Sequence, residues 1–374
     1  MYRLVRRCQP LSLFVLCGFV LLLGACSSAP VLPNSDVAAS ALVEPGYGGK
    51  PGEVHGGVAR FATIHEAVQA APSTARTWSI WITPGNYVEK VVLDKKNVRL
   101  YATDPRKTTL SWNDYAGKKG PDGKPLGNLG SATLAIVAPG CRVENLGITN
   151  AFDYVGNLKK PTSDPSRVNS GTQATALAVD LEADRTAIIN CRITGNQDTL
   201  FANAGSQYYA NCTVTGSVDF IYGAAQAWFE DCDLVSLDRK GLVNSYNGYV
   251  TAPSTGIDKP YGYVFYNCRL KKEKPDMEPR SVQLGRPWHP GGSLNVNSSS
   301  IWINCYMDDH ISANGYVPMG ENNKEFYPQD NRFFEYGSTG PGAMDVQALR
   351  RQLKADETVK ITPELVLSGW KPAQ

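Results

Sequence analysis

The sequence predicts an all-β protein whose chain winds into a parallel β-solenoid forming a single domain. Its 374 residues include 35 Gly and 24 Pro among many Val, Thr, Tyr and Asn, a composition typical of short strands joined by turns. Few segments keep the 3.6-residue apolar period of a helix. One phrase is also repeated, because NCRITGNQD begins at Asn190 and NCTVTGSVD begins 21 residues later at Asn211. Repetition at such a short period is typical of solenoids.

The six cysteines in the body of the chain share one sequence context. Each follows Asn, Asp or Gly and precedes a strand-like run, and successive cysteines are 50, 21, 20, 36 and 37 residues apart. Spacings near 20 fit one solenoid coil, and the longer spacings fit coils with inserted loops. Because cysteine is small and readily buried, we expect an interior file made of Cys141, Cys191, Cys212, Cys232, Cys268 and Cys305.

These cysteines also allow a disulfide, but spacing alone does not choose the pair. Equivalent positions of neighbouring coils lie about 4.8 Å apart, which is within the Cα range that a disulfide tolerates. Cys212 with Cys232 and Cys191 with Cys212 are both candidates. No CxxC occurs and the four histidines are scattered, so we expect no metal site and no cofactor.

The N-terminus has the pattern of a targeting segment. Three arginines in MYRLVRRCQP precede an apolar run that is shorter than the roughly 20 residues of a membrane span. The run ends in LGAC, which resembles a bacterial lipobox, so we expect a signal peptide over residues 1–25 and acyl chains on Cys26. Serine after this cysteine resembles the outer-membrane sorting signal, so an outer-membrane lipoprotein is expected. Residues 26–55, rich in Ala, Ser, Pro and Gly, predict a flexible tether.

The solenoid domain is expected over residues 56–374, with a short capping helix near each end. FATIHEAVQAAP, residues 61–72, has a helical stripe of apolar residues and stops at a proline. MDVQALRRQLKADE, residues 344–357, has a similar amphipathic pattern. Net charge is only +2, and no basic patch is evident, so nucleic acid is not an expected partner. A monomer is expected.

The repeated phrases each end on a carboxylate, Asp198 and Asp219. If 21 residues make one coil, the two side chains lie next to each other on neighbouring coils. Two like charges so close do not both ionise readily, so one pKa rises while the other group stays ionised. The pair therefore predicts one proton donor and one anion, the combination that acid–base and nucleophilic catalysis require.

Five motifs in order extend this interpretation: GNYVEKV, GTQATAL, GNQDTLF, GSVDFIYG and LGRPW. Through them the chain resembles the pectin methylesterases over residues 56–370. The resemblance implies a right-handed parallel β-helix that hydrolyses galacturonate methyl esters of pectin or oligogalacturonides and releases methanol. It also implies that the family's recurring disulfide falls on Cys212 and Cys232.

Catalytic roles follow from the same resemblance. Asp219 would attack the ester carbonyl as the nucleophile, and Asp198 would act as general acid and then as general base. Gln197 would donate a hydrogen bond to the oxyanion, with Gln173 converging from another coil. Arg286 would hold Asp219 through paired hydrogen bonds.

Four further residues are predicted to contact the substrate. The ring of Trp288 offers an apolar face on which a sugar can stack. Thr133 lies where the family binds substrate, and Met307 is a candidate contact in the cleft. Phe201 stands where the family more often has Tyr, whereas Tyr222 stands where Phe is common.

Three alternatives share parts of this pattern. A polygalacturonase would hold its two acids roughly 6.5–9.5 Å apart, and a pectate lyase would need a calcium cluster. Neither predicts two glutamines beside an arginine aimed at a carboxylate, and no G-x-S-x-G of a serine esterase occurs. Two alternatives remain: an esterase or thioesterase that acts on another substrate, and a solenoid that only binds polysaccharide.

Overall fold

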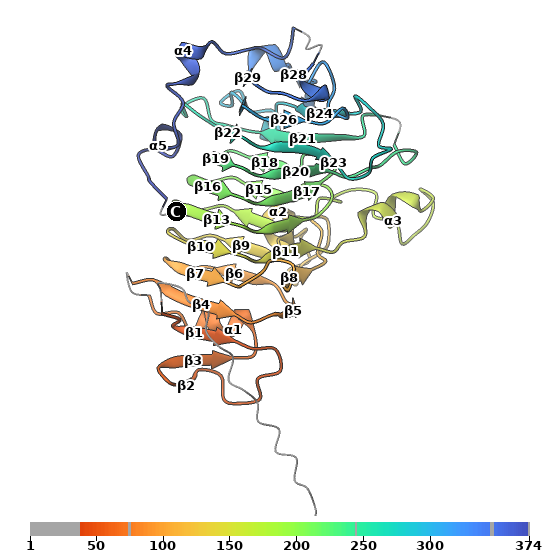
Figure 1. The fold of residues 1–374 in the computed structure, drawn as a ribbon. Coiled ribbons are helices and arrows are strands. Elements are labelled where there is room, and N and C mark those ends of the chain that lie inside the picture. The colour runs from red at the N-terminus through yellow and green to blue at the C-terminus, as the bar shows by residue number, and fades with distance from the viewer. Residues whose placement is uncertain (1–37, 74–75, 244, 345–347, 373–374) are drawn as a thin grey trace, which may run out of the picture. The chain divides into compact units, whose positions relative to one another are not determined.

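The computed structural model describes residues 38–73, 76–243, 245–344 and 348–372, which belong to one compact unit. In these residues the chain forms a parallel β-helix, as predicted (Figure 1). From β4 to β26, successive strands pass in turn to three sheets, called A, B and C here, so that each complete coil contributes one strand to each sheet. The predicted signal peptide and Cys26 lie outside the described residues.

Among the residues described, sheet A has 12 strands and forms one side of every coil. Its strands in spatial order are β2 (Glu53–His55), β3 (Val58–Phe61), β1 (Ala41–Val43), β4 (Trp78–Ile82), β7 (Val98–Tyr101), β10 (Arg142–Glu144), β13 (Thr186–Ile189), β16 (Ser206–Ala210), β19 (Gln226–Glu230), β22 (Tyr263–Tyr266), β25 (Ser299–Ile303) and β29 (Arg332–Tyr336). All neighbouring strands are parallel except β2 and β3, which form an antiparallel pair at the N-terminal edge.

Sheets B and C form the other two sides. Sheet B consists of β5 (Gly85–Val88), β8 (Thr108–Trp112), β11 (Gly147–Asn150), β14 (Arg192–Thr194), β17 (Thr213–Gly216), β20 (Asp233–Ser236), β23 (Arg269–Lys272) and β26 (Tyr306–Met307). Sheet C consists of β6 (Val91–Leu93), β9 (Leu134–Ile136), β12 (Leu177–Val179), β15 (Leu200–Ala202), β18 (Ile221–Gly223), β21 (Gly248–Pro253) and β24 (Val282–Gly285). The core lies inside the coils and is built from the inward-facing residues of all three sheets.

Helices and a hairpin cover the ends and edges of the coils. The hairpin pairs β27 (Met319–Glu321) with β28 (Lys324–Phe326). The helices are α1 (Ile64–Gln69), α2 (Gly127–Ser131), α3 (Tyr154–Lys159), α4 (Ala355–Thr358) and α5 (Pro363–Val366), with 3-10 turns at Pro290–Gly292, Pro328–Asp330 and Pro341–Ala343. Helix α3 lies in a loop that projects from the coils, and the C-terminal segment runs back along them (Figure 1).

The corner between sheets A and B explains the repeated context of the cysteines. At this corner a residue adopts left-handed backbone with φ between 50° and 56°, a conformation that Asn and Asp tolerate best after Gly. The corner residues are Asn145, Asn190, Asn211, Asp231, Asn267 and Asn304. The next residue points into the core, and from Cys191 onward it is cysteine, whereas Leu146 takes this place one coil earlier. Cys141 follows Gly140 at a different corner, so it does not belong to the predicted file.

The predicted Cys212–Cys232 disulfide is absent, because all six cysteines of the described residues are free and buried. Each thiol contacts backbone carbonyl oxygens instead. Cys212 Sγ lies 3.4 Å from the oxygen of Ile188, and Cys232 Sγ lies 3.3 Å from the oxygen of Glu230. Burial raises the pKa of the Cys212 thiol well above its usual range.

The N-terminal boundary of the domain was predicted too late. Residues 41–43 and 53–55 lie within the predicted tether, but they form β1 and β2 of sheet A. Strand β1 pairs with β3 on one side and β4 on the other, and its three residues are buried. A strand this short shows no period in the sequence, yet pairing on both sides stabilises it.

The predicted caps are confirmed at one end and corrected at the other. Helix α1 begins after Thr63, which forms a capping box with Glu66, and it buries three apolar residues against the core. The predicted helix over 344–357 is wrong for residues 348–354, which are not helical. There Arg350 is buried and its guanidinium forms two hydrogen bonds with Glu335, 2.7 and 2.6 Å long.

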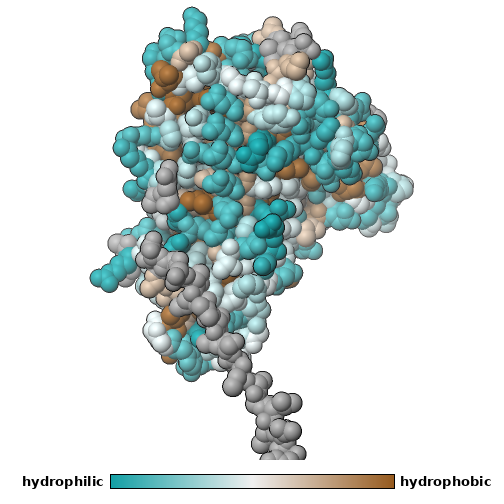
Figure 2. Space-filling view, in the orientation of Figure 1, coloured by the Kyte–Doolittle hydropathy of each residue, from teal (hydrophilic) through white to brown (hydrophobic). Residues whose placement is uncertain are grey.

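The surface in Figure 2 is mostly hydrophilic, and its apolar residues form small separate areas. The exposed large apolar residues include Val54, Leu181, Ile257 and Leu294, which come from separate loops and edges. Within the described ranges, no helix has the length and apolar character needed to cross a membrane.

Candidate active site

The two predicted carboxylates lie on neighbouring coils at the corner between sheets B and C. Asp198 precedes β15 and Asp219 precedes β18, and the backbone N–H of Asp198 donates to the oxygen of Val218 at 2.9 Å. Gln197 forms a parallel bridge with Val218, so Asp198 and Asp219 occupy equivalent positions one strand spacing apart. This confirms the arrangement predicted from the 21-residue repeat.

The glycine of each repeated phrase is also explained by this corner. A Cβ at Gly216 would lie 2.1 Å from Cβ of Phe220, and one at Gly195 would lie 2.8 Å from Oγ1 of Thr199. Glycine therefore allows the chain to turn tightly before each carboxylate. Both aspartates then adopt left-handed backbone, with φ of 59° at Asp198 and 46° at Asp219.

Arg286 holds the Asp219 carboxylate with both arms of its guanidinium. Nε donates to Oδ1 at 2.9 Å, and a terminal nitrogen donates to Oδ2 at 2.6 Å. The guanidinium also lies 4.1 Å from the centroid of the Tyr249 ring, a cation–π contact. Burial disfavours its charge, but the carboxylate of Asp219 outweighs this, and the pKa of Arg286 is raised. The guanidinium is therefore fixed by a carboxylate at its edge and by a ring at its face.

Asp198 is the member of the pair with a raised pKa. Burial and the negative charge of Asp219 raise its pKa well above the usual range for Asp, and the charge of Arg286 and a hydrogen bond from Gln197 oppose this only in part. A carboxyl group with a raised pKa keeps its proton at a pH where ordinary carboxyls have lost it. The site thus holds an acid next to a carboxylate fixed by a cation.

The two predicted glutamines lie beside the acid. The Thr172 hydroxyl donates to Gln197 Oε1 at 2.8 Å, so the amide N–H groups of Gln197 remain available as donors. The backbone N–H of Ala174 donates to the backbone carbonyl oxygen of Gln197 at 3.1 Å, which places the neighbouring Gln173 on the adjoining coil. Sequence analysis missed Thr172, although its position directly before Gln173 in GTQATAL marked it.

An aromatic platform lies next to these residues on the outer face of sheet C. The rings of Phe201 and Tyr222 stack with centroids 4.6 Å apart, and the Tyr222 ring is 5.7 Å from that of Trp288. Phe201 and Tyr222 are register partners on β15 and β18. The hydroxyl of Tyr222, which a phenylalanine at this position would lack, forms a buried 3.0 Å hydrogen bond with the hydroxyl of Thr175. Phe201 and Trp288 therefore lie together on this face, with Phe201 buried and Trp288 partly exposed, and their contact with the substrate stays a prediction.

Two predicted substrate contacts are corrected. Thr133 is fully buried, and its hydroxyl donates to the backbone oxygen of Thr149 at 3.0 Å. Met307 is also fully buried, because it lies on sheet B and points into the core, where its sulfur is 3.2 Å from a terminal nitrogen of Arg350. Both side chains stabilise the coils and neither reaches a cleft.

The hairpin β27–β28 flanks the platform, which the sequence did not predict. His289 directly follows Trp288, and its ring stacks on that of Phe326 with centroids 3.7 Å apart. Its Nδ1 lies 2.8 Å from the Ser293 oxygen, so the imidazole packs between loop and hairpin. In the described part of the chain, no three His, Cys, Asp or Glu residues gather as metal ligands would.

Comparison with known proteins agrees with this geometry. The family model Pectinesterase matches residues 54–362. The chain belongs to the pectinesterase family. It is 35% identical to pectinesterase A of Dickeya dadantii over 326 residues, which are 83% of this chain and 88% of that protein.

Solved pectin methylesterase structures are similar to this pectinesterase over nearly their full length. One, in complex with a hexasaccharide, is 34% identical with a TM-score of 0.83 and covers 90% of this chain and 99% of its own. The enzyme from Yersinia enterocolitica is 35% identical with a TM-score of 0.79 and covers 83% of this chain and 99% of its own. The pectinesterase is therefore a carboxylic ester hydrolase on a parallel β-helix.

Proposed function

We propose that this pectinesterase removes methyl groups from galacturonate methyl esters in pectin, with Asp219 as nucleophile and Asp198 as general acid and base. The observation that carries the proposal is the pair of neighbouring carboxyl groups, one held by a guanidinium fork and the other buried with a raised pKa. Their different environments assign them different roles.

The first half of the reaction forms an acyl-enzyme. An oxygen of Asp219 attacks the ester carbonyl carbon, and negative charge develops on the carbonyl oxygen. Thr172 holds the amide oxygen of Gln197 and one amide N–H donates to Asp198, so the second N–H of Gln197 is the donor proposed for this oxygen, with Gln173 adjoining. The carbon–methoxy bond then breaks, and Asp198 gives its proton to the leaving oxygen, so that methanol departs and an anhydride with Asp219 remains.

The second half returns the enzyme to its starting state. The ionised Asp198 takes a proton from water, and the hydroxide attacks the acyl carbon. The bond to Asp219 breaks, and the galacturonic acid product gives its proton to solvent and leaves as the carboxylate, while Asp198 keeps the proton taken from water. Arg286 stabilises the carboxylate of Asp219 as it leaves, because its two hydrogen bonds fit the ionised form.

The substrate class follows from the family and from the platform. A structural relative binds a hexasaccharide, and the partly buried Trp288 ring beside Phe201 and Tyr222 provides apolar faces for sugar rings. We therefore propose methyl-esterified pectin or its oligogalacturonides as substrate, bound along the outer face of sheet C.

Methanol release from methylated pectin tests this function. Wild type should release methanol without shortening the chain or forming unsaturated products, and Asp219→Asn and Asp198→Asn should each lose at least a thousandfold in rate. Asp308→Asn, a change to an aspartate at the same corner of a later coil, is the matched control and should keep wild-type rates. Full activity in Asp219→Asn would refute the assignment of the nucleophile.

We further propose that acyl chains on Cys26 anchor the protein to the outer membrane. The proposal is supported by the LGAC sequence after an apolar run. Labelling of cells with a palmitate analogue should mark the wild type and fail in Cys26→Ala. Equal labelling of Cys26→Ala would overturn the anchor.

A further inference from the structure

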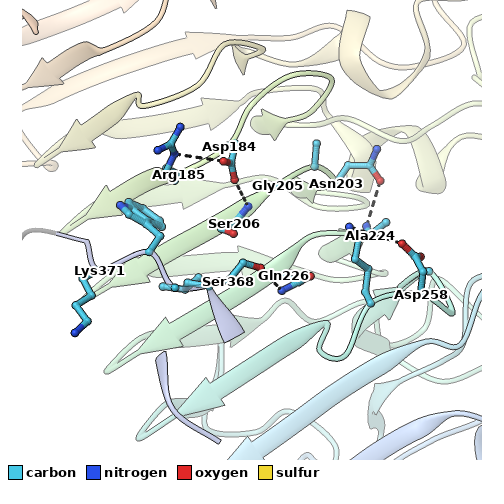
Figure 3. A pocket seen from close by; sticks show the side chains of 16 residues that line it. Asp184, Arg185, Asn203, Gly205, Ser206, Ala224, Gln226, Asp258, Ser368 and Lys371 are labelled. Carbon is cyan, nitrogen blue, oxygen red and sulfur yellow. Dashed lines mark hydrogen bonds and ion pairs between the residues drawn. The ribbon is translucent and has the colours of Figure 1, made fainter. Parts of the chain in front are cut away.

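A second pocket lies at the opposite ends of the strands that carry the aromatic platform. Residues 203–206 and Ala224, which directly follow β15 and β18, line one side, and residues 367–371 of the C-terminal segment line the other. Its volume is about 860 Å³, within the range of ligand sites in proteins. Figure 3 shows Ser206, Gln226 and Ser368 close together between these two sides.

The C-terminal segment is fastened where it forms the pocket wall. Gln226 is buried on β19, and its amide nitrogen donates to the Val366 oxygen at 2.7 Å and to the Ser368 hydroxyl at 2.9 Å. Val366 and Leu367 are buried against the apolar outer residues of sheet A. The pocket is therefore pre-formed, so a ligand would not have to order this wall.

The pocket is lined by three cationic side chains and by two carboxylates, those of Asp184 and Asp258, so its lining carries a net positive charge suited to an acidic sugar. Arg185, Lys259 and Lys371 line the pocket with side chains that are 60, 51 and 73% exposed. Each lies near a single carboxylate at 3.3, 3.8 and 3.1 Å, respectively. Exposed pairs of this kind contribute only about 0–1 kcal/mol, so a ligand carboxylate can replace them. Trp370 adds an indole ring on which a sugar can stack.

We propose that this pocket binds a de-esterified segment of the galacturonan chain. Such a segment is the product of the proposed function, so this inference rests on that function. Every ester hydrolysed adds a carboxylate to the chain, so the product is the more anionic partner. Strands β15 and β18 are three residues long, or about 10 Å, and they connect the catalytic corner to the pocket. Both sites therefore lie within the length of one oligosaccharide.

Isothermal titration calorimetry with fully de-esterified hexagalacturonate at low salt tests the proposal. Trp288→Ala should weaken hexagalacturonate binding at the catalytic site, and in this variant binding to the pocket should remain. Adding Arg185→Gln and Lys259→Gln should weaken the remaining binding at least tenfold. The matched control removes two exposed lysines from early coils, Lys96→Gln with Lys107→Gln, and should leave binding unchanged.

Three results would overturn the proposal. Binding could be unaffected by the pocket changes, could be weakened equally by the control, or could be matched by a neutral hexasaccharide. Thermal unfolding of each variant shows whether it is folded, and Trp370→Ala provides an uncharged change in the same pocket with the same expected loss. Wild type that releases methanol but fails these binding tests overturns the pocket alone, whereas wild type that releases no methanol overturns the proposed function.

Discussion

The fork between Arg286 and Asp219 makes a quantitative prediction for Arg286→Lys. Lysine keeps the positive charge, but its ammonium cannot reproduce two parallel hydrogen bonds or lie flat on the Tyr249 ring. The substitution therefore separates charge from geometry. If the fork aims Asp219 at the ester, the loss should appear in the rate of acylation.

The size of the loss can be estimated from the contacts. One charged hydrogen bond contributes about 1.5–3 kcal/mol, and a cation–π contact about 0.5–2 kcal/mol. The side chains of Arg286 and Asp219 are 22 and 8% exposed, so solvent screens the pair in part and the lower values apply. A total of about 2–3 kcal/mol corresponds to a decrease of roughly 30- to 150-fold in kcat/KM.

The assay is initial-rate methanol release over a range of pectin concentrations. We expect the decrease mainly in kcat, because the fork acts on the nucleophile rather than on bound sugar, and Tyr249→Leu should lose less than tenfold. Circular dichroism should show an unchanged fold. Activity of Arg286→Lys within threefold of wild type would refute the argument, since charge alone would then position Asp219.

Three further predictions concern protons and stability. The pKa of Asp198 is higher in the folded than in the unfolded protein, so Asp198 stabilises the fold below the unfolded pKa, and this stabilisation is lost as pH rises through the folded pKa. Methanol release should decline over the same rise in pH. Calorimetry should find Asp198→Asn stabilising at pH 8 but not at pH 4. Tyr222→Phe should keep the ring stack and lower the free energy of unfolding by about 1–2 kcal/mol, measured in urea, because the buried hydroxyl of Thr175 loses its partner; an unchanged midpoint would contradict this. Arg350→Met should cost about 3–5 kcal/mol by leaving Glu335 buried without its cation, and adding Glu335→Gln should recover part of the loss, whereas a double variant as unstable as the single one would exclude the ion pair as the cause.

The sequence predicted the coil and the catalytic pair because both depend on local chemistry that repeats. Asn190 and Asn211 recur because the corner needs left-handed backbone, and Gly195 and Gly216 recur because the next corner is tight. Such requirements restrict the residue type directly. One coil therefore marks the position of the next.

Other features could not be predicted, because they depend on which side of a coil a residue faces. Thr133 is polar and Met307 has a polarisable sulfur, and both were predicted to contact the substrate, yet both side chains are fully buried. Cys141 has the same local context as the other cysteines but follows a different corner. Short strands offer too few residues for alternation to fix their orientation, and only the register of the neighbouring coils decides it.

The chain ends were predicted poorly for a related reason. Residues 41–43 are too few for a pattern, and they become a strand only by pairing with β3 and β4. Residues 348–354 have a helical pattern, but a turn at residues 348–350 lets Arg350 reach the buried carboxylate of Glu335, and Gln352 then forms a parallel bridge with Glu335. Tertiary contacts outweighed helix propensity there.

The stacking of identical corners gives the catalytic face a fixed unit of length. Side chains that leave the same corner of successive coils can be separated only by whole multiples of the strand spacing, about 4.8 Å. Asp198 and Asp219 occupy the smallest such separation, which the backbone ladder maintains whatever the surrounding loops do. Coils beyond those that carry Gln173 and Arg286 can therefore be gained or lost without disturbing the chemistry. A coil inserted between the two aspartates would move them to about 9.6 Å and abolish proton transfer to the departing methanol.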